Sequence, residues 1–183
     1  MKPVVKKILI GVGAVVGLFV AVGFVLPSSY ETSRSVEIDA PPEVVFELVN
    51  HLPSNERWSP WKEADPTIEE TYSEAKSGVG AYYTWTSEKM GEGRLEIKVS
   101  EPHTRIENAL NFGQQLPATG TWSFEAVGDA KTKVTWGISG ENGMNPINRW
   151  FGLVMDSLVG ADFERGLGNL KRVAESEAKA PAP

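Results

Sequence analysis

One uninterrupted apolar run near the N-terminus limits what this chain can be. Ile8 to Leu26 reads ILIGVGAVVGLFVAVGFVL and contains no charged or polar side chain. At an α-helical rise of about 1.5 Å per residue, this segment spans roughly 28 Å, close to the thickness of the hydrocarbon core of a bilayer. We therefore expect residues 8–26 to form a transmembrane anchor, with 1–7 as a short cytoplasmic tail and 27–29 as a linker.

The charges that flank the run predict its orientation. Lys2, Lys6 and Lys7 precede it, whereas four of the five charged residues among the twenty that follow it are acidic. The positive-inside rule then places the N-terminus in the cytoplasm and the following domain on the periplasmic or extracellular side of an inner (cytoplasmic) membrane. A cleaved signal peptide is the alternative, with Ala-Val-Gly at 21–23 as the cleavage site, although the run is longer than a typical signal sequence.

Small residues recur along one face of the expected membrane helix. Gly13, Gly17 and Ala21 lie four positions apart, a spacing that lets two membrane helices approach closely. Glycine is also common in membrane helices that do not pair. The spacing therefore allows a homodimer through this face but does not require one.

The remaining chain, 27–183, is long enough for one domain and is strongly acidic. Removing the three N-terminal lysines from the 18 basic residues leaves 15 against 24 acidic ones, a formal charge of −9. This balance argues against a nucleic-acid partner, because nucleic acids select basic surfaces. The two histidines lack metal-ligand spacing and there is no cysteine, so we predict neither a metal site nor a cofactor.

Hydrophobic patterning predicts one α+β domain over residues 30–177, followed by a flexible tail at 178–183. Residues 30–38 partly alternate and predict a strand, and Asp39 with two following prolines indicates a capped helix start. A long amphipathic helix is expected over 147–177, because apolar residues recur there at three- and four-residue spacing.

Between these helices the chain alternates in the manner of antiparallel strands. Leu95, Ile97 and Val99 fall on one predicted face, and a glycine-rich turn is expected at 89–93. A sheet with one apolar face and a helix with one apolar stripe each need a partner. We therefore expect the antiparallel sheet to wrap around the long C-terminal helix.

Five segments carry a family resemblance: IDAPPEVVF at 38–46, WSPW at 58–61, GEG at 91–93, TKVTW at 132–136 and DFERGLGNLK at 162–171. In this order they resemble the START-like, helix-grip superfamily, in particular its polyketide cyclase/dehydrase and lipid-transport branch, often labelled SRPBCC. The resemblance implies a cavity under the C-terminal helix. Members bind lipids, sterols, plant hormones or polyketides, and some are cyclases, dehydratases or partner-binding modules, so the fold alone does not name a function. A membrane anchor departs from the soluble form typical of the superfamily.

Aromatic side chains are the best candidates for a binding site. Six tryptophans are many for this length, and tryptophan combines a large apolar surface with one N–H donor, which suits an amphipathic ligand. Plain core packing is the alternative explanation for the same residues. The candidate ligand-binding residues are Trp58, Trp61, Trp85, Phe112, Trp122, Trp136, Met155, Val159 and Phe163.

No catalytic residue is assigned from the sequence. Glu96 and Glu107 alternate with apolar neighbours and are expected to face solvent, where a general acid or base has no substrate to reach. Asn108 has the opposite, inward parity, but the sequence shows no partner for it.

Three functions remain compatible with these patterns. We favour a membrane-tethered module that binds a hydrophobic or lipid-like small molecule between the sheet and the C-terminal helix. The alternatives are a partner-binding or scaffold domain with a filled core, and a polyketide cyclase- or dehydratase-like enzyme, which needs a buried acid, base or oxyanion donor. A cavity of roughly 300 Å³ or more, open near Trp58 and Trp61, would favour the first and the third over a filled core.

Overall fold

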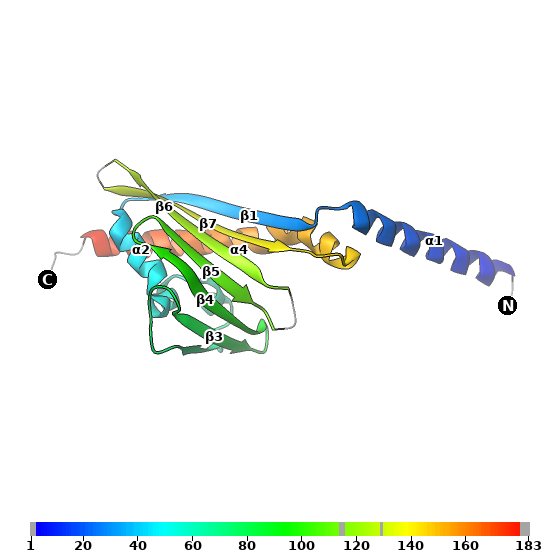
Figure 1. The fold of residues 1–183 in the computed structure, drawn as a ribbon, viewed down its shortest axis with the longest axis horizontal. Helices are drawn as coiled ribbons and strands as arrows, with labels where there is room; N and C mark the ends of the chain where they lie inside the picture. The colour runs from blue at the N-terminus through cyan, green and yellow to red at the C-terminus, as the bar shows by residue number, and fades with distance from the viewer. Residues whose placement is uncertain (1–2, 114–115, 129, 180–183) are drawn as a thin grey trace.

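The computed structural model describes residues 3–113, 116–128 and 130–179. It shows an α+β domain preceded by one long helix that projects away from it (Figure 1). The elements in chain order are α1 (Pro3–Val25), β1 (Ser29–Ile38), α2 (Pro42–Asn50), the 3-10 helix η1 (Leu52–Arg57), α3 (Pro60–Ala64), β2 (Glu69–Tyr72), β3 (Tyr82–Ser87), β4 (Gly91–Glu101), β5 (Arg105–Asn111), β6 (Ala118–Val127), β7 (Lys131–Glu141) and α4 (Pro146–Lys179).

Helix α1 contains the apolar run. Its segment Lys7–Val25 is long and apolar enough to cross a membrane, and its side chains are almost all exposed. A membrane span and a signal sequence both satisfy this description. The helix begins at Pro3, so the described part of the expected N-terminal tail is helical, while Lys2 lies outside the described residues.

All seven strands form one antiparallel sheet in the order β1-β7-β6-β5-β4-β3-β2. The order follows the chain from β2 to β7, and β1 completes the sheet by pairing with β7. Helix α4 packs along β1 and runs behind β1 and β7 in Figure 1. The antiparallel sheet and the long C-terminal helix are therefore confirmed.

The predicted alternation fails in β4. A register shift between Ile97 and Val99 places Val99 opposite Glu107 and Ser100 opposite Ile106. Ser100 therefore shares the inner face with Ile97, and its hydroxyl donates a hydrogen bond to Asn50 Oδ1 at 2.9 Å. A β-bulge is the physical reason, because one extra residue moves every later side chain to the other face. Val99 does not share the face of Ile97 as predicted.

The start of α2 also differs from the prediction. Pro41 occupies the N-cap position and no side chain caps the helix. The Asp39 carboxylate lies 2.8 Å from Lys131 Nζ instead. Asp39 is therefore not the cap: the helix begins at Pro42, and the fixed φ of proline suits the first turn.

Helix α4 has two unlike halves. In the second half Phe163, Leu167 and Leu170 are buried against the sheet, whereas the first half is largely exposed. The helix continues to Lys179, so the first part of the expected tail is helical and residues 180–183 lie outside the described residues.

Candidate ligand-binding site

Four of the predicted site residues form a packed core, which we call the tryptophan cluster: Trp58, Trp122, Trp136 and Phe163. Their side chains are at most 9% exposed. The ring of Trp136 stacks on Trp122 with centroids 4.6 Å apart and on Phe163 with centroids 4.1 Å apart. Such stacked and edge-on contacts are those of an ordinary interior. Core packing therefore accounts for these four residues.

The position of Trp58 corrects one expectation. It follows η1 in an irregular segment, yet it is only 4% exposed and lies edge-on to Trp122. Its indole Nε1 donates a hydrogen bond to the carbonyl oxygen of Leu48 at 3.0 Å. Trp58 thus belongs to the interior and does not border an opening. Trp61 is half-buried and packs against the same core from α3.

A second group of rings remains partly exposed, and we call it the aromatic patch: Tyr72, Tyr83, Trp85 and Phe112. The ring centroids are 5.6 Å apart for Tyr72 and Tyr83, 5.9 Å for Tyr83 and Trp85, and 5.8 Å for Trp85 and Phe112. Strand pairing brings the four together, because Tyr72 lies opposite Tyr83 in the β2–β3 register. The patch is therefore one continuous apolar surface with accessible rings.

A glycine makes room for the largest ring of the patch. Gly93 in β4 lies opposite Trp85 in β3, and a Cβ at this position would collide with the indole ring. Because Gly93 lies within the strand, the predicted turn at 89–93 is only partly a turn, and β4 begins at Gly91.

Two buried amides supply polar groups beside these rings. Asn108 is 6% exposed on the inner face of β5, and Asn55 is 9% exposed in η1, where its side chain contacts Tyr83. Among the described residues, neither Oδ1 atom accepts a hydrogen bond. A buried acceptor without a partner costs about 1–3 kcal/mol. Both oxygens are therefore buried acceptors that lack a donor in the described part of the chain.

The two tyrosines of the patch stay protonated. Burial is the main reason that the pKa of Tyr72 is raised, and its hydroxyl also donates a hydrogen bond to Glu70 Oε2 at 2.5 Å. Burial likewise raises the pKa of Tyr83, while the Asn55 contact acts in the opposite direction. Both phenols are therefore neutral hydrogen-bonding groups rather than bases near neutral pH.

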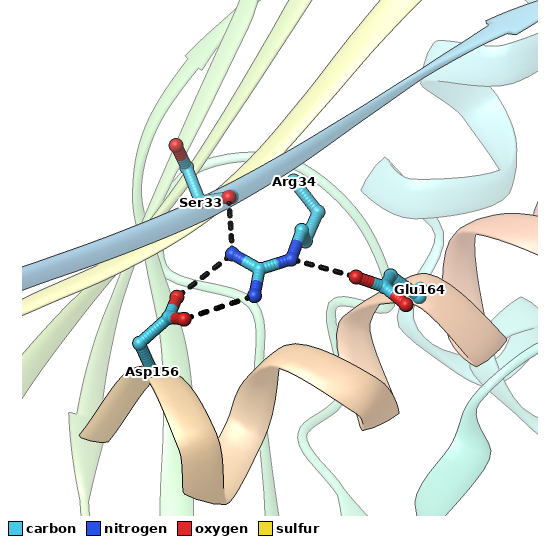
Figure 2. Close-up of polar contacts among 4 residues, drawn as sticks. All are labelled: Ser33, Arg34, Asp156 and Glu164. Carbon is cyan, nitrogen blue, oxygen red and sulfur yellow. Dashed lines mark hydrogen bonds and ion pairs between the residues drawn. The ribbon is translucent and has the colours of Figure 1, made fainter. Parts of the chain in front are cut away.

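Helix α4 is fixed beside the sheet by one arginine of β1 (Figure 2). Arg34 contacts both carboxylate oxygens of Asp156, at 2.8 and 3.1 Å, and its Nε donates to Glu164 at 2.9 Å. These pairs raise the pKa of Arg34 and lower that of Asp156. Met155 directly precedes Asp156 and Val159 follows it by three residues, and both side chains are half-buried.

The structure also contains two open surface hollows, of about 540 and 250 Å³. The residues that line the larger one are Gly168, Lys171, Arg172, Glu175, Ser176 and Lys179, and those that line the smaller one are Glu47, Leu48, His51, Ser54, Arg57 and Glu177. None of these is a predicted site residue, so neither hollow is the cavity that we expected.

The sequence named only part of the aromatic patch. Trp85 and Phe112 were predicted, whereas Tyr72 and Tyr83 were missed. Tyr83 was detectable, because it has the same parity as Trp85 within a single strand. The outward orientation of Glu96 is as predicted: it pairs with Arg94 and Lys98 on the outer face.

A protein-family model described as "Polyketide cyclase / dehydrase and lipid transport" matches residues 30–175. No curated protein matches the chain.

Solved structures show the same fold at low sequence identity. A protein from Thermobifida fusca is 16% identical with a TM-score of 0.62, and the match covers 84% of this chain and 97% of that one. The Aha1 dimer from Colwellia psychrerythraea is 14% identical with a TM-score of 0.58, over 82% of this chain and 98% of that one. DynU16, a putative protein in the dynemicin biosynthetic locus, is 17% identical with a TM-score of 0.56, over 81% of this chain and 48% of that one.

Proposed function

Because the chain belongs to the polyketide cyclase/dehydrase and lipid-transport family, we propose that it is a membrane-tethered domain that binds a hydrophobic, lipid-like small molecule. The fold is that of a ligand-binding domain. The proposed site lies on the inner face of the sheet at the aromatic patch, to which Trp85 and Phe112 contribute, and Met155 and Val159 of α4 stay predicted members of it.

The aromatic patch with its two buried amides is the observation that carries the proposal. The rings of the tryptophan cluster pack against one another and leave no apolar surface for a ligand. The patch instead leaves apolar rings partly exposed, and the side chain of Asn55, whose buried Oδ1 has no partner among the described residues, contacts Tyr83. An apolar surface with a few convergent polar groups is typical of a small-molecule site. We therefore expect a ligand with an apolar body that covers these rings.

The proposed tether is α1. Its length and apolar composition fit a membrane span, and a tethered domain stays where lipid-like molecules partition. The basic residues before the apolar run, Lys7 among them, predict that the domain lies on the periplasmic or extracellular side of the inner membrane. A homodimer through Gly13, Gly17 and Ala21 stays a prediction.

A partner-binding domain with a filled core is the second candidate. The packing of the tryptophan cluster favours it, because that half of the interior has no room for a ligand. This candidate predicts that no small molecule binds the aromatic patch.

Photolabelling separates the two candidates. The full chain is reconstituted in lipid vesicles that contain a fatty alcohol with a photoreactive tail, and the cross-linked peptides are identified by mass spectrometry. We expect labelling in β3 and β5, a severalfold loss in Trp85→Ala, and no loss in Thr84→Ala, whose side chain lies on the opposite face of β3. Labelling confined to α1 would contradict ligand binding and favour the filled core.

A further inference from the structure

The first half of α4 exposes a continuous apolar stripe. Ile147, Phe151, Val154 and Leu158 recur at helical spacing, and their side chains are 53, 60, 45 and 56% exposed. A helix on the surface of a soluble domain normally turns such a stripe inward and shows polar residues to water. A contiguous exposed apolar surface indicates that something covers it. We call these four residues the α4 stripe.

The start of α4 is packed against α1. The indole ring of Trp150 stacks on Phe19, with ring centroids 4.7 Å apart and an interplanar angle of 6°. Its Nε1 also donates a hydrogen bond to the carbonyl oxygen of Phe19 at 3.1 Å. One turn closer to the end of α1, Gly23 abuts Pro146 so closely that a Cβ would lie 2.6 Å from the proline Cβ. The position of α1 therefore fixes the position of the first turns of α4.

The contact with Phe19 indicates how deep Trp150 would lie in a bilayer that α1 spans. Phe19 lies about 9 Å from the C-terminal end of α1, at an α-helical rise of 1.5 Å per residue. If α1 spans a bilayer, its partner Trp150 lies below the headgroup surface. Helices that lie in the membrane interface bury their apolar face by roughly 5–10 Å, and tryptophan is enriched at that level. The α1–α4 contact therefore places the first turns of α4 at the level of the headgroup region.

The one charged side chain in this region is already satisfied by hydrogen bonds. Between Met144 and Met155 the only charged side chain is Arg149. Its guanidinium donates to the carbonyl oxygens of Phe24 at 2.6 Å, Gly143 at 3.1 Å and Leu26 at 3.2 Å. A cation that caps the carbonyls at the end of a helix is favourable, and a charge with several hydrogen bonds costs less to move out of water. The first turns of α4 are therefore compatible with lipid.

We infer that the α4 stripe docks the domain on the lipid bilayer, in contact with the leaflet at which α1 ends. The inference rests on the proposed tether. It is supported by the continuity of the stripe with the apolar surface of α1, through the Trp150–Phe19 contact. One consequence is that the side of α4 that carries Met155 and Val159 is held close to lipid.

The test uses site-directed fluorescence, since the chain contains no cysteine. Phe151→Cys places a nitrobenzoxadiazole label on the stripe. Val127→Cys is the matched control, because Val127 is also an exposed apolar residue but ends β6 at the turn to β7, on the far side of the domain from α1 (Figure 1). Val16→Cys places the same label on α1. Each full-length variant is reconstituted in phosphatidylethanolamine–phosphatidylglycerol vesicles without spin-labelled lipid, with lipid spin-labelled near the headgroup end of the acyl chain, or with lipid spin-labelled near its tail end.

We expect the headgroup-end spin label to cause a severalfold loss of emission at position 151, the tail-end spin label to cause one at position 16, and neither to affect position 127. If position 16 is quenched and position 151 behaves like position 127, the docking inference is overturned and the tether stands. A label at position 151 that is shielded from water but not quenched by the lipid shows that a second copy of the chain covers the stripe, which also overturns it. If position 16 is not quenched, the tether fails and the inference fails with it.

Discussion

A pair of glycines in α4 offers a direct test of how closely this helix packs on the sheet. Gly166 and Gly168 lie in the same helix, two residues apart. A Cβ at Gly166 would lie 2.7 Å from Cζ3 of Trp136 and 3.0 Å from Cδ of Pro60, whereas a Cβ at Gly168 would have nothing within 4 Å. The Trp136 ring is held between Trp122 and Phe163 and has no free space to move into.

The expected magnitudes follow from these contacts. Alanine in place of glycine favours a helix by about 1 kcal/mol, so Gly168→Ala should stabilise the domain by roughly that amount. Gly166→Ala gains the same helix propensity but overpacks a filled core, which costs about 1–3 kcal/mol. The difference between the two variants isolates the overpacking, because both share one helix. For a domain of this size it corresponds to a melting-temperature difference of roughly 2–12 °C.

The assay is thermal unfolding of the two full-length variants in the same detergent, followed by near-ultraviolet circular dichroism. The expected order of melting temperature is Gly168→Ala, then the wild type, then Gly166→Ala. Equal shifts in the two variants would refute the reasoning, because they would show that α4 does not approach Trp136 as closely as the structure has it.

Three further outcomes follow from the same contacts. Trp136→Ala should lower the free energy of unfolding by about 3–5 kcal/mol in a urea titration, and a loss below about 1 kcal/mol would contradict a packed tryptophan cluster. Hydrogen bonds, first from Ser87, lower the pKa of Asp65 from 3.8 to about 2, so its contribution to stability is complete above pH 3.8 and is lost as the pH falls toward 2. Asp65→Asn should therefore reduce the loss of unfolding free energy between about pH 4 and pH 2. An unchanged loss would show that Asp65 does not contribute to stability in this way. Arg34→Leu should raise the pKa of Asp156 toward its ordinary value in an NMR titration, and an unmoved pKa would show that this pair does not form.

The regular elements were accessible from the sequence because their patterns are local. Alternation in β7 placed Val134, Trp136 and Ile138 on one face, and all three are buried. Helical spacing likewise placed α4 to within two residues at each end. Periodicity reports which side chains share a face, and in these elements nothing overrides it.

The remaining features depend on contacts between segments distant in the chain. Trp58 is buried because Trp122 of β6 and Trp136 of β7 pack against it. No sequence pattern near Trp58 reveals these contacts. The bulge in β4 is set by its pairing with β5. The apolar spacing of α4 is continuous, yet only its second half is covered by the sheet and the helices beside it, so the exposure of Phe151 follows from tertiary structure alone.

Ligand binding at the aromatic patch is the central claim, and native mass spectrometry tests it most directly. Residues 28–183 are expressed without α1, purified without detergent, checked for folding by circular dichroism, and incubated with membrane lipid extract. We expect additional mass that organic solvent removes, and a loss of that mass in Trp85→Ala but not in Thr84→Ala. A folded domain that keeps its bare mass after exposure to the extract would contradict the account and make a protein partner the better explanation.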